Sequence, residues 1–298
     1  MEYRKLSGRV LSPTFTYGAS AYRLEVRPTQ WKALMRMVWR WLQCEKDTKK
    51  LFRKEVAYFG GVLPQKSLAS PIGLYAYVEK EKQKFMPLVS HRSIKKKAYV
   101  SPTNFIFEFR SYVHMEKSLD WYIDLFYLST LLAGVGKRSR RARGVITLEE
   151  MGSNNDLESF LSQLESLMNT YSESPQPLFK REGNTIKRVV DDSNCVKYPV
   201  IEKIQLSSRK ISEVNYFLKR VDWVSSEVKS THKRGYFLTG KGRFRSSLIV
   251  TLVEVRKGEI YPLYVFLRPV LDGRVLNIQS NKKQKDDRKR FVNLLEKN

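Results

Sequence analysis

Apolar residues recur with helical spacing just after Arg27-Pro28, and this is the clearest periodic pattern in the first half of the chain. Proline in the first turn is typical of a helix start, because that position needs no N–H. A stripe with this spacing predicts an amphipathic helix that buries one face. The stripe consists of Trp31, Leu34, Met35, Val38 and Leu42.

The remaining patterns of the first half predict four strands and a second helix. Alternating apolar residues bounded by turn residues indicate strands, whereas a longer apolar run indicates a helix. We expect strands at residues 3–17, 72–78, 105–112 and 144–148 and a helix at residues 119–132. This βαββαβ order is that of a ferredoxin-like, RRM-type domain, which we place at residues 1–152.

The second half predicts a degenerate copy of the same fold over residues 153–298. We expect a helix at residues 157–168, a linker or exposed loop at 171–192, and a helix at 211–228 among strands at 200–206, 247–255 and 260–267. We also expect a basic helix over residues 281–295, whose charged face could equally be solvated or contact RNA. The predicted fold class is therefore α+β with two ferredoxin-like domains.

The net charge of the chain gives the first indication of its binding partner. The chain has 55 Lys and Arg residues against 30 Asp and Glu residues, a formal net charge of +25, and both halves are basic. Such an excess indicates a polyanionic partner. No apolar run approaches the ~18 residues of a spanning helix and no signal peptide is recognisable, so we expect a cytoplasmic protein that binds no membrane. Cys44 and Cys195 are too few for a four-cysteine zinc site.

The strongest candidate site is the loop after the second helix, with the sequence LLAGVGKRSRRARG at residues 131–144. Gly134 and Gly136 permit positive φ and close backbone approach, backbone N–H groups can surround an anion, and guanidinium groups bind phosphate bidentately. We predict that this glycine loop contacts RNA through Gly134, Gly136, Lys137, Arg138, Arg140, Arg141 and Arg143. The alternative is a solvated basic loop.

A nucleotide-binding loop does not fit this segment. In a Walker loop, glycine would stand where Leu131 is, and a hydroxyl residue would replace Arg138.

The first helix offers a second basic element, because Lys32, Arg36 and Arg40 are spaced by four residues on one face. Like charges in this arrangement destabilise a helix unless an anion lies along them. We predict that these three residues contact RNA and form one wall of a channel whose other wall is the glycine loop.

Several motifs resemble, in this order, a RAMP subunit, the one named first in the Cmr complex of type III-B CRISPR systems. They are SPTFTYGAS at residues 12–20, RPTQWKALMRMVWRWL at 27–42, AYFGG at 57–61, SPIGL at 70–74 and the glycine loop. In the second half, GRFRSSLIVTLVEV at residues 242–255 is similar to a strand of the second RAMP domain. The segment Ala142-Arg143-Gly144 departs from the family, which more often has glycine and an aromatic residue there.

This resemblance implies a non-catalytic subunit of an antiviral ribonucleoprotein, built from two RAMP-type ferredoxin-like domains. Its implied partners are guide RNA, contacted near the 3′ part, target RNA and other RAMP subunits. The resemblance implies no cofactor and no small-molecule substrate. It also implies RNA contacts for Lys32, Arg36, Arg40, Arg138, Arg140 and Arg141, in agreement with the charge pattern.

The competing hypothesis is an enzyme, because some RAMP relatives cleave precursor RNA without a metal. A metal-independent endoribonuclease needs a proton-transfer group, and His91, His114 and His232 are the candidates. A structural histidine is the commoner case for His114 at a strand end, and the other two lie in Lys- and Arg-rich segments. No DxD or HExxH signature is present, and Asp191-Asp192 lies in the predicted linker.

Overall fold

The computed structural model describes residues 2–20, 22–90, 92–112, 116–151, 154–190, 196–231, 246–271, 274–275 and 286–297. The elements up to residue 150 are β1 (Tyr3–Val10), α1 (Pro28–Leu42), α2 (Thr48–Phe59), β2 (Gly61–Leu63), β3 (Lys66–Leu68), β4 (Ile72–Lys80), β5 (Gln83–Pro87), β6 (Lys95–Tyr99), β7 (Asn104–Ser111), α3 (Leu119–Leu132) and β8 (Ile146–Leu148). Those that follow are α4 (Leu157–Tyr171), β9 (Phe179–Glu182), β10 (Thr185–Arg188), β11 (Ile201–Leu206), α5 (Val214–Thr231), β12 (Leu248–Arg256), β13 (Glu259–Leu267), β14 (Val270–Leu271), β15 (Arg274–Val275) and α6 (Asp287–Glu296).

The first half contains the predicted βαββαβ order, with additions between its elements. The strands β4, β7, β1 and β8 form an antiparallel sheet in that spatial order, and α1 and α3 are the two helices of the pattern. The sequence did not predict α2 or the hairpins β2–β3 and β5–β6. The predicted strand at residues 3–17 ends at Val10, and only isolated bridges follow at Thr14 and Tyr17.

The second half forms a five-stranded sheet in the order β12-β13-β11-β10-β9. Its strands β12, β13 and β11 correspond in order to β4, β7 and β1, while β10 lies beside β11 where β8 lies beside β1. The prediction of a linker at 171–192 is wrong for β9 and β10, because these strands pair with each other and β10 pairs with β11. The division at residues 152 and 153 and the identity of both halves as ferredoxin-like domains remain predictions.

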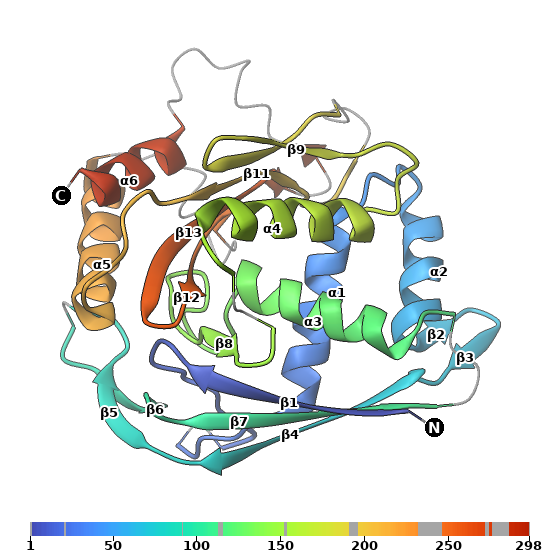
Figure 1. Cartoon of the computed structure of the whole chain (residues 1–298), viewed down its shortest axis with the longest axis horizontal. Helices are drawn as coiled ribbons and strands as arrows, with labels where there is room; N and C mark the ends of the chain where they lie inside the picture. Colours follow the sequence, from blue (N-terminus) through green and yellow to red (C-terminus); the bar gives the residue numbers. More distant parts are fainter. Residues whose placement is uncertain are drawn as a thin grey trace.

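Helices α3 and α4 lie on one side of the second sheet, and α5 and α6 lie on the other (Figure 1). One face of this sheet packs with α3 and α4 in a large hydrophobic cluster that also includes the inner face of the first sheet. The other face packs with α5 and α6 in a second cluster. Because both faces are covered, β12 and β13 are apolar along almost their whole length rather than alternating.

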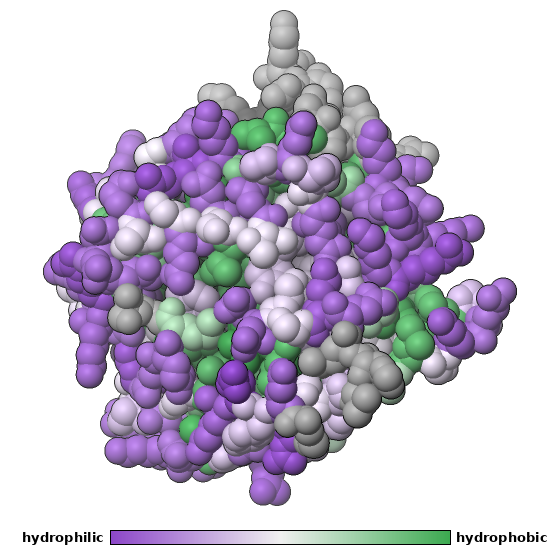
Figure 2. All heavy atoms as spheres, turned by 45° about the vertical axis from the view of Figure 1, so that its right-hand side comes forward, coloured by the Kyte–Doolittle hydropathy of each residue, from purple (hydrophilic) through white to green (hydrophobic). Residues whose placement is uncertain are grey.

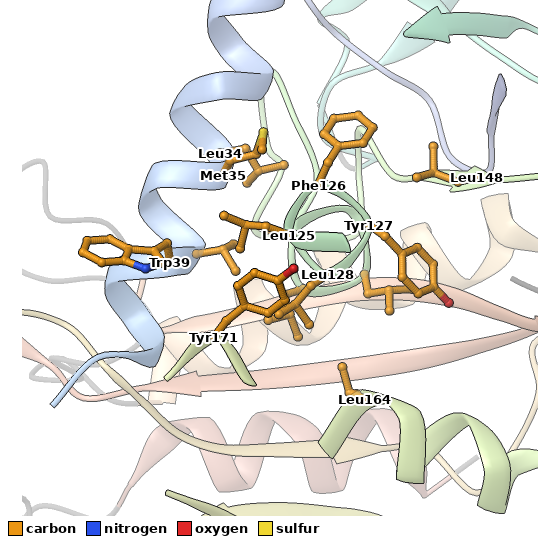
Figure 3. Packing of buried hydrophobic residues seen from close by; sticks show 14 of the residues in the cluster. Leu34, Met35, Trp39, Leu125, Phe126, Tyr127, Leu128, Leu148, Leu164 and Tyr171 are labelled. Carbon is orange, nitrogen blue, oxygen red and sulfur yellow. The ribbon is translucent and has the colours of Figure 1, made fainter. Parts of the chain in front are cut away.

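The large cluster is built around α1 and α3 (Figure 3). Leu34 and Met35 of α1 point toward Leu125 and Phe126 of α3. The ring of Trp39 points away from α3 and packs against Tyr58 and Phe59 of α2. Helix α3 has a nearly uniform apolar surface, as expected for a helix buried between two sheets. Since the cluster contains residues from both halves, the two sheets share one core.

We expect Phe126→Ala to lower the free energy of unfolding by about 3–5 kcal/mol, because it leaves a cavity in this core. Phe126 is fully buried, and its ring centroid lies 4.8 Å from that of Phe107 and 5.2 Å from that of Phe109. Phe85→Ala is the matched control, since Phe85 is 63% exposed. Denaturant unfolding should leave the control within about 0.5 kcal/mol of wild type. Equal losses in both variants would contradict the shared core.

Candidate nucleic-acid interface

The glycine loop joins α3 to β8 and has four residues with positive φ. Gly136 and Gly144 have φ of 79° and 72°, which glycine adopts without strain. Arg138 and Ala142 also lie in the left-handed region, at 65° and 56°. A non-glycine residue there costs about 1–3 kcal/mol, so the surrounding contacts must hold the loop in place.

Those contacts are hydrogen bonds from the loop N–H groups to protein carbonyls. Lys137 N donates to Phe15 O at 3.0 Å, and Gly144 N donates to Pro13 O at 3.0 Å. Ala142 N donates to Val250 O at 2.7 Å, so that Arg141 forms a parallel bridge with Val250 at the outer edge of β12. The expectation that these N–H groups bind an anion is therefore wrong for the three named donors.

Gly134 and Gly136 permit a close backbone approach, but the approaching atoms belong to the protein. A Cβ on Gly134 would lie 2.4 Å from Arg143 O, and one on Gly136 would lie 2.5 Å from Phe15 O. Gly134 has no positive φ, in contrast to the prediction. The two glycines allow the loop to fold tightly on itself and on the segment after β1.

Asp222 of α5 binds the glycine loop to the second half. This carboxylate has no exposed surface and lies 2.5 Å from Arg143 Nη2 and 2.8 Å from Arg138 Nη2. It also accepts hydrogen bonds from Ser90 N at 2.7 Å and Ser90 Oγ at 2.8 Å. Burial by itself raises the pKa of Asp222, but Arg143 and the Ser90 hydrogen bonds bring the pKa below its ordinary value of 3.8.

Two of the predicted RNA-contacting arginines are buried. Arg143 is 2% exposed and bound to Asp222, and Arg141 is 7% exposed. Arg141 Nη1 donates to Leu248 O at 3.0 Å, and its guanidinium lies 5.5 Å from the ring centroid of Phe291. Burial and the neighbouring arginines lower the pKa of Arg141 to about 10, so it remains charged at neutral pH. We correct the prediction for Arg141 and Arg143, because their side chains contact protein groups instead of facing solvent.

The basic face of α1 is also paired within the protein. Lys32 Nζ donates to Ser70 Oγ at 3.0 Å and to Ile72 O at 2.8 Å. Arg36 donates to Phe59 O and Gly60 O at the carboxyl end of α2, while Arg40 lies 2.5 Å from the buried Glu55. The anion expected along this row is a protein carboxylate, because Glu55 of α2 lies beside Arg36 and Arg40. Lys32 is instead bound by Ser70 and Ile72.

An open groove of about 880 Å³ nevertheless separates α1 from the glycine loop. Arg36 and Arg40 of α1 line one side, and Arg138 and Arg140 of the glycine loop line the other. Arg141, which is 7% exposed, is also a lining residue. Lys32 and Lys137 are not among the lining residues. Lys32 is held at Ser70, and Lys137 Nζ lies 4.9 Å from the ring centroid of Tyr17. Of the six residues predicted to form the two walls, all but Lys32 line this groove, and their contact with RNA stays a prediction.

The second half contributes to this groove in a way that the motifs did not indicate. Ser225 of α5 and Ser246 before β12 complete its lining, and Arg140 donates to Ser246 O. The guanidinium of Arg140 also lies 5.8 Å from the ring centroid of Trp41. A signal for Asp222 was present, because this carboxylate lies directly beside the apolar stripe of Phe217, Val221, Val224 and Val228.

The candidate residues of the enzyme hypothesis lie outside the described residues, namely His91, His114, His232 and Asp191-Asp192. Cys195 does too, whereas Cys44 is a free, half-buried thiol. In the part of the chain that the structure describes, no group of three or more His, Cys, Asp or Glu side chains could hold a metal ion. Across the same residues, no helix is both long and apolar enough to span a bilayer.

We expect Asp222→Asn to destabilise the protein by about 3–5 kcal/mol at pH 7, because it leaves buried Arg143 without its counter-charge. The control is Asp120→Asn, since Asp120 is 73% exposed and lies 3.8 Å from Arg4, where a loss below about 1 kcal/mol is expected. Because folding lowers the pKa of Asp222, its contribution is present above pH 3.8 and is lost as pH falls through the lower folded value. Thermal unfolding between pH 7 and pH 2 should show this acid loss in wild type and not in Asp222→Asn.

The fold of this chain is similar to that of solved protein structures. Neither a family model nor a curated protein matches the chain. Cmr1 from Pyrococcus furiosus, in its apo crystal structure, is 16% identical with a TM-score of 0.60, over 99% of this chain and 96% of that chain. A chain of the type III-B Cmr-beta bound to cognate target RNA and AMPPnP is 14% identical with a TM-score of 0.58, over 98% of both chains. A further Cmr-beta chain, from the complex bound to cognate target RNA, is 14% identical with a TM-score of 0.54. The chain therefore has the fold of Cmr1 along its whole length, and the resemblance of its motifs is confirmed at the level of the fold.

Proposed function

We propose that this protein is an RNA-binding subunit of a type III-B CRISPR effector complex and that RNA lies in the groove between α1 and the glycine loop. The fold shared with Cmr1 supports the assignment to such a complex. Two similar chains belong to Cmr-beta structures bound to target RNA, which supports RNA and other Cmr subunits as partners. Guide RNA, contacted near its 3′ part, is the second RNA partner in this proposal.

The observation that carries the proposal is the pair of basic walls around one groove. Arg36 and Arg40 have side chains 32% and 48% exposed, and that of Arg138 on the opposite wall is 28% exposed. Guanidinium groups on both sides suit a phosphodiester backbone, which they bind through charge-assisted hydrogen bonds. Hydrophilic residues also cover most of the face drawn in Figure 2, as expected for a chain with a net charge of +25. Such a groove recognises backbone and shape rather than base sequence.

The protein should bind single-stranded RNA with little sequence preference and strong salt dependence. Each phosphate contact contributes about −0.7 to the slope of log K against log salt for a single strand. Three to four contacts in the groove should therefore give a slope of about −2 to −3 in fluorescence anisotropy with unrelated 30-nucleotide sequences. A flat response would contradict the proposal.

Arg140→Gln should weaken RNA binding by about tenfold, because charge-assisted contacts contribute about 1.5–3 kcal/mol before solvent exposure reduces them. Arg40→Gln, on the opposite wall, should weaken the same measurement, and the double variant should show less than the sum because both groups would share one backbone. The matched control is Arg53→Gln on the exposed surface of α2, away from the groove lining. Wild-type affinity in both groove variants would contradict the location of the site.

The proposal includes a non-catalytic role. We expect purified protein to leave labelled guide and target RNA intact, both with and without magnesium. Cleavage that is lost in His114→Ala would instead support a metal-independent RAMP endoribonuclease. The cleavage assay is independent of the affinity measurement. RNA binding in the groove can therefore be tested whether or not the protein cleaves RNA.

A further inference from the structure

The outer face of the first sheet carries a concentration of exposed tyrosines. All helices in the described part of the chain lie on the inner side of β4, β7 and β1, and none covers the opposite face (Figure 1). Phe105, Phe107 and Phe109 of β7 point into the core, so the alternate residues of the same strand point outward. This outer face therefore has no packing partner among the described helices.

Strand pairing aligns the outward residues in rows. Tyr3 of β1 and Gly73 of β4 both pair with Arg110 of β7. In the next row, Tyr75 of β4 pairs with Glu108. The four exposed tyrosines of this tyrosine face are Tyr3, Tyr75, Tyr77 and Tyr112, with exposed fractions of 45%, 47%, 42% and 48%.

Arg110 lies between two of these rings. Its guanidinium carbon is 4.9 Å from the ring centroid of Tyr75 and 5.8 Å from that of Tyr3. Gly73 leaves room for a third ring, because a Cβ at this position would lie 2.8 Å from the hydroxyl oxygen of Tyr112. Rings and a cation from three neighbouring strands thus form one continuous surface.

The composition of the tyrosine face favours one kind of ligand. Ile106, its aliphatic member, is only 2% exposed, so the accessible carbon belongs mainly to aromatic rings. Glu108 accepts hydrogen bonds from Tyr77 at 3.1 Å and from Arg110 at 3.3 Å, so its charge is paired, whereas Lys5 is exposed on the same face. Aromatic rings beside cations are the combination that binds single-stranded nucleic acid through base stacking.

We propose that the tyrosine face is a second RNA site, where bases of a single strand stack on Tyr75 and Tyr3 beside Arg110 while the exposed Lys5 offsets backbone charge. The inference rests on the proposed RNA-binding function but concerns a different surface from the groove. The groove binds phosphates, whereas the tyrosine face binds bases. The two sites therefore differ in what they require of a ligand.

The test compares two probes, a fluorescein-labelled 30-nucleotide oligouridine and a polyphosphate chain, which has charge but no bases. Tyr75→Ala combined with Tyr3→Ala should weaken oligouridine binding by about 5- to 150-fold for each stacked base that is lost. The same variant should bind polyphosphate like wild type. Tyr75→Phe combined with Tyr3→Phe should keep oligouridine affinity because the rings remain.

The matched control is Tyr216→Ala on α5, since Tyr216 is 59% exposed and lies in the other half of the molecule. Melting temperatures of all variants should equal that of wild type, because the substituted side chains are exposed. A Phe variant that binds as poorly as the Ala variant would overturn stacking. Lost oligouridine affinity in Tyr216→Ala of equal size would overturn the location.

The remaining outcomes separate this inference from the proposed function. If Arg140→Gln weakens binding of both probes while the tyrosine variants bind oligouridine like wild type, the stacking site is overturned and the groove stands. If the tyrosine variants keep RNA affinity but no longer assemble with another protein subunit, the face is a protein interface and the inference is overturned. If wild-type protein binds neither probe, both are overturned.

Discussion

The buried carboxylate of Asp222 is the interaction on which the arrangement of this molecule depends. Three segments that are distant in sequence meet at it: the glycine loop through Arg138 and Arg143, the turn after β5 through Ser90, and α5. A buried carboxylate needs both counter-charge and hydrogen bonds, and here it has both. This cluster holds the glycine loop, which lines one side of the groove, against the second half.

Packing around the second sheet imposes the other constraint. One face of β12 and β13 contributes to the cluster shared with α3 and α4, and the opposite face contributes to the cluster of α5 and α6. Neither half can therefore move far without exposing part of a common core. Positions in the groove that come from different halves, such as Arg40 and Ser225, are accordingly fixed relative to each other. This rigidity suits the recognition of a nucleic-acid backbone by shape.

The sequence predicted the helices and strands that have a clear apolar pattern of their own. It missed contacts between residues that are distant in the sequence. Helix α1 was predicted because its apolar stripe is self-evident, and α2 was missed although Asp47 is an N-cap acceptor for Lys49 N. The hairpin β9–β10 was mistaken for a linker because its residues are mostly polar and its stability comes from pairing with β11. Charge identified the loop correctly as basic, but it could not show that Arg143 faces Asp222, 79 residues away. The presence of an arginine in the sequence does not show whether its side chain contacts a ligand or forms a buried ion pair.

The bridge between Arg141 and Val250 bears on how the two halves depend on each other. Strand β12 is at an edge of the five-stranded sheet, and unpaired edges are templates for association between chains. The glycine loop covers part of that edge with backbone from the other half of the chain. A second half made on its own would present both this uncovered edge and the apolar sheet face that α3 now covers. The loop thus blocks edge-to-edge association at β12 in addition to lining the groove. Because each half covers apolar surface of the other, we expect the two halves to unfold together.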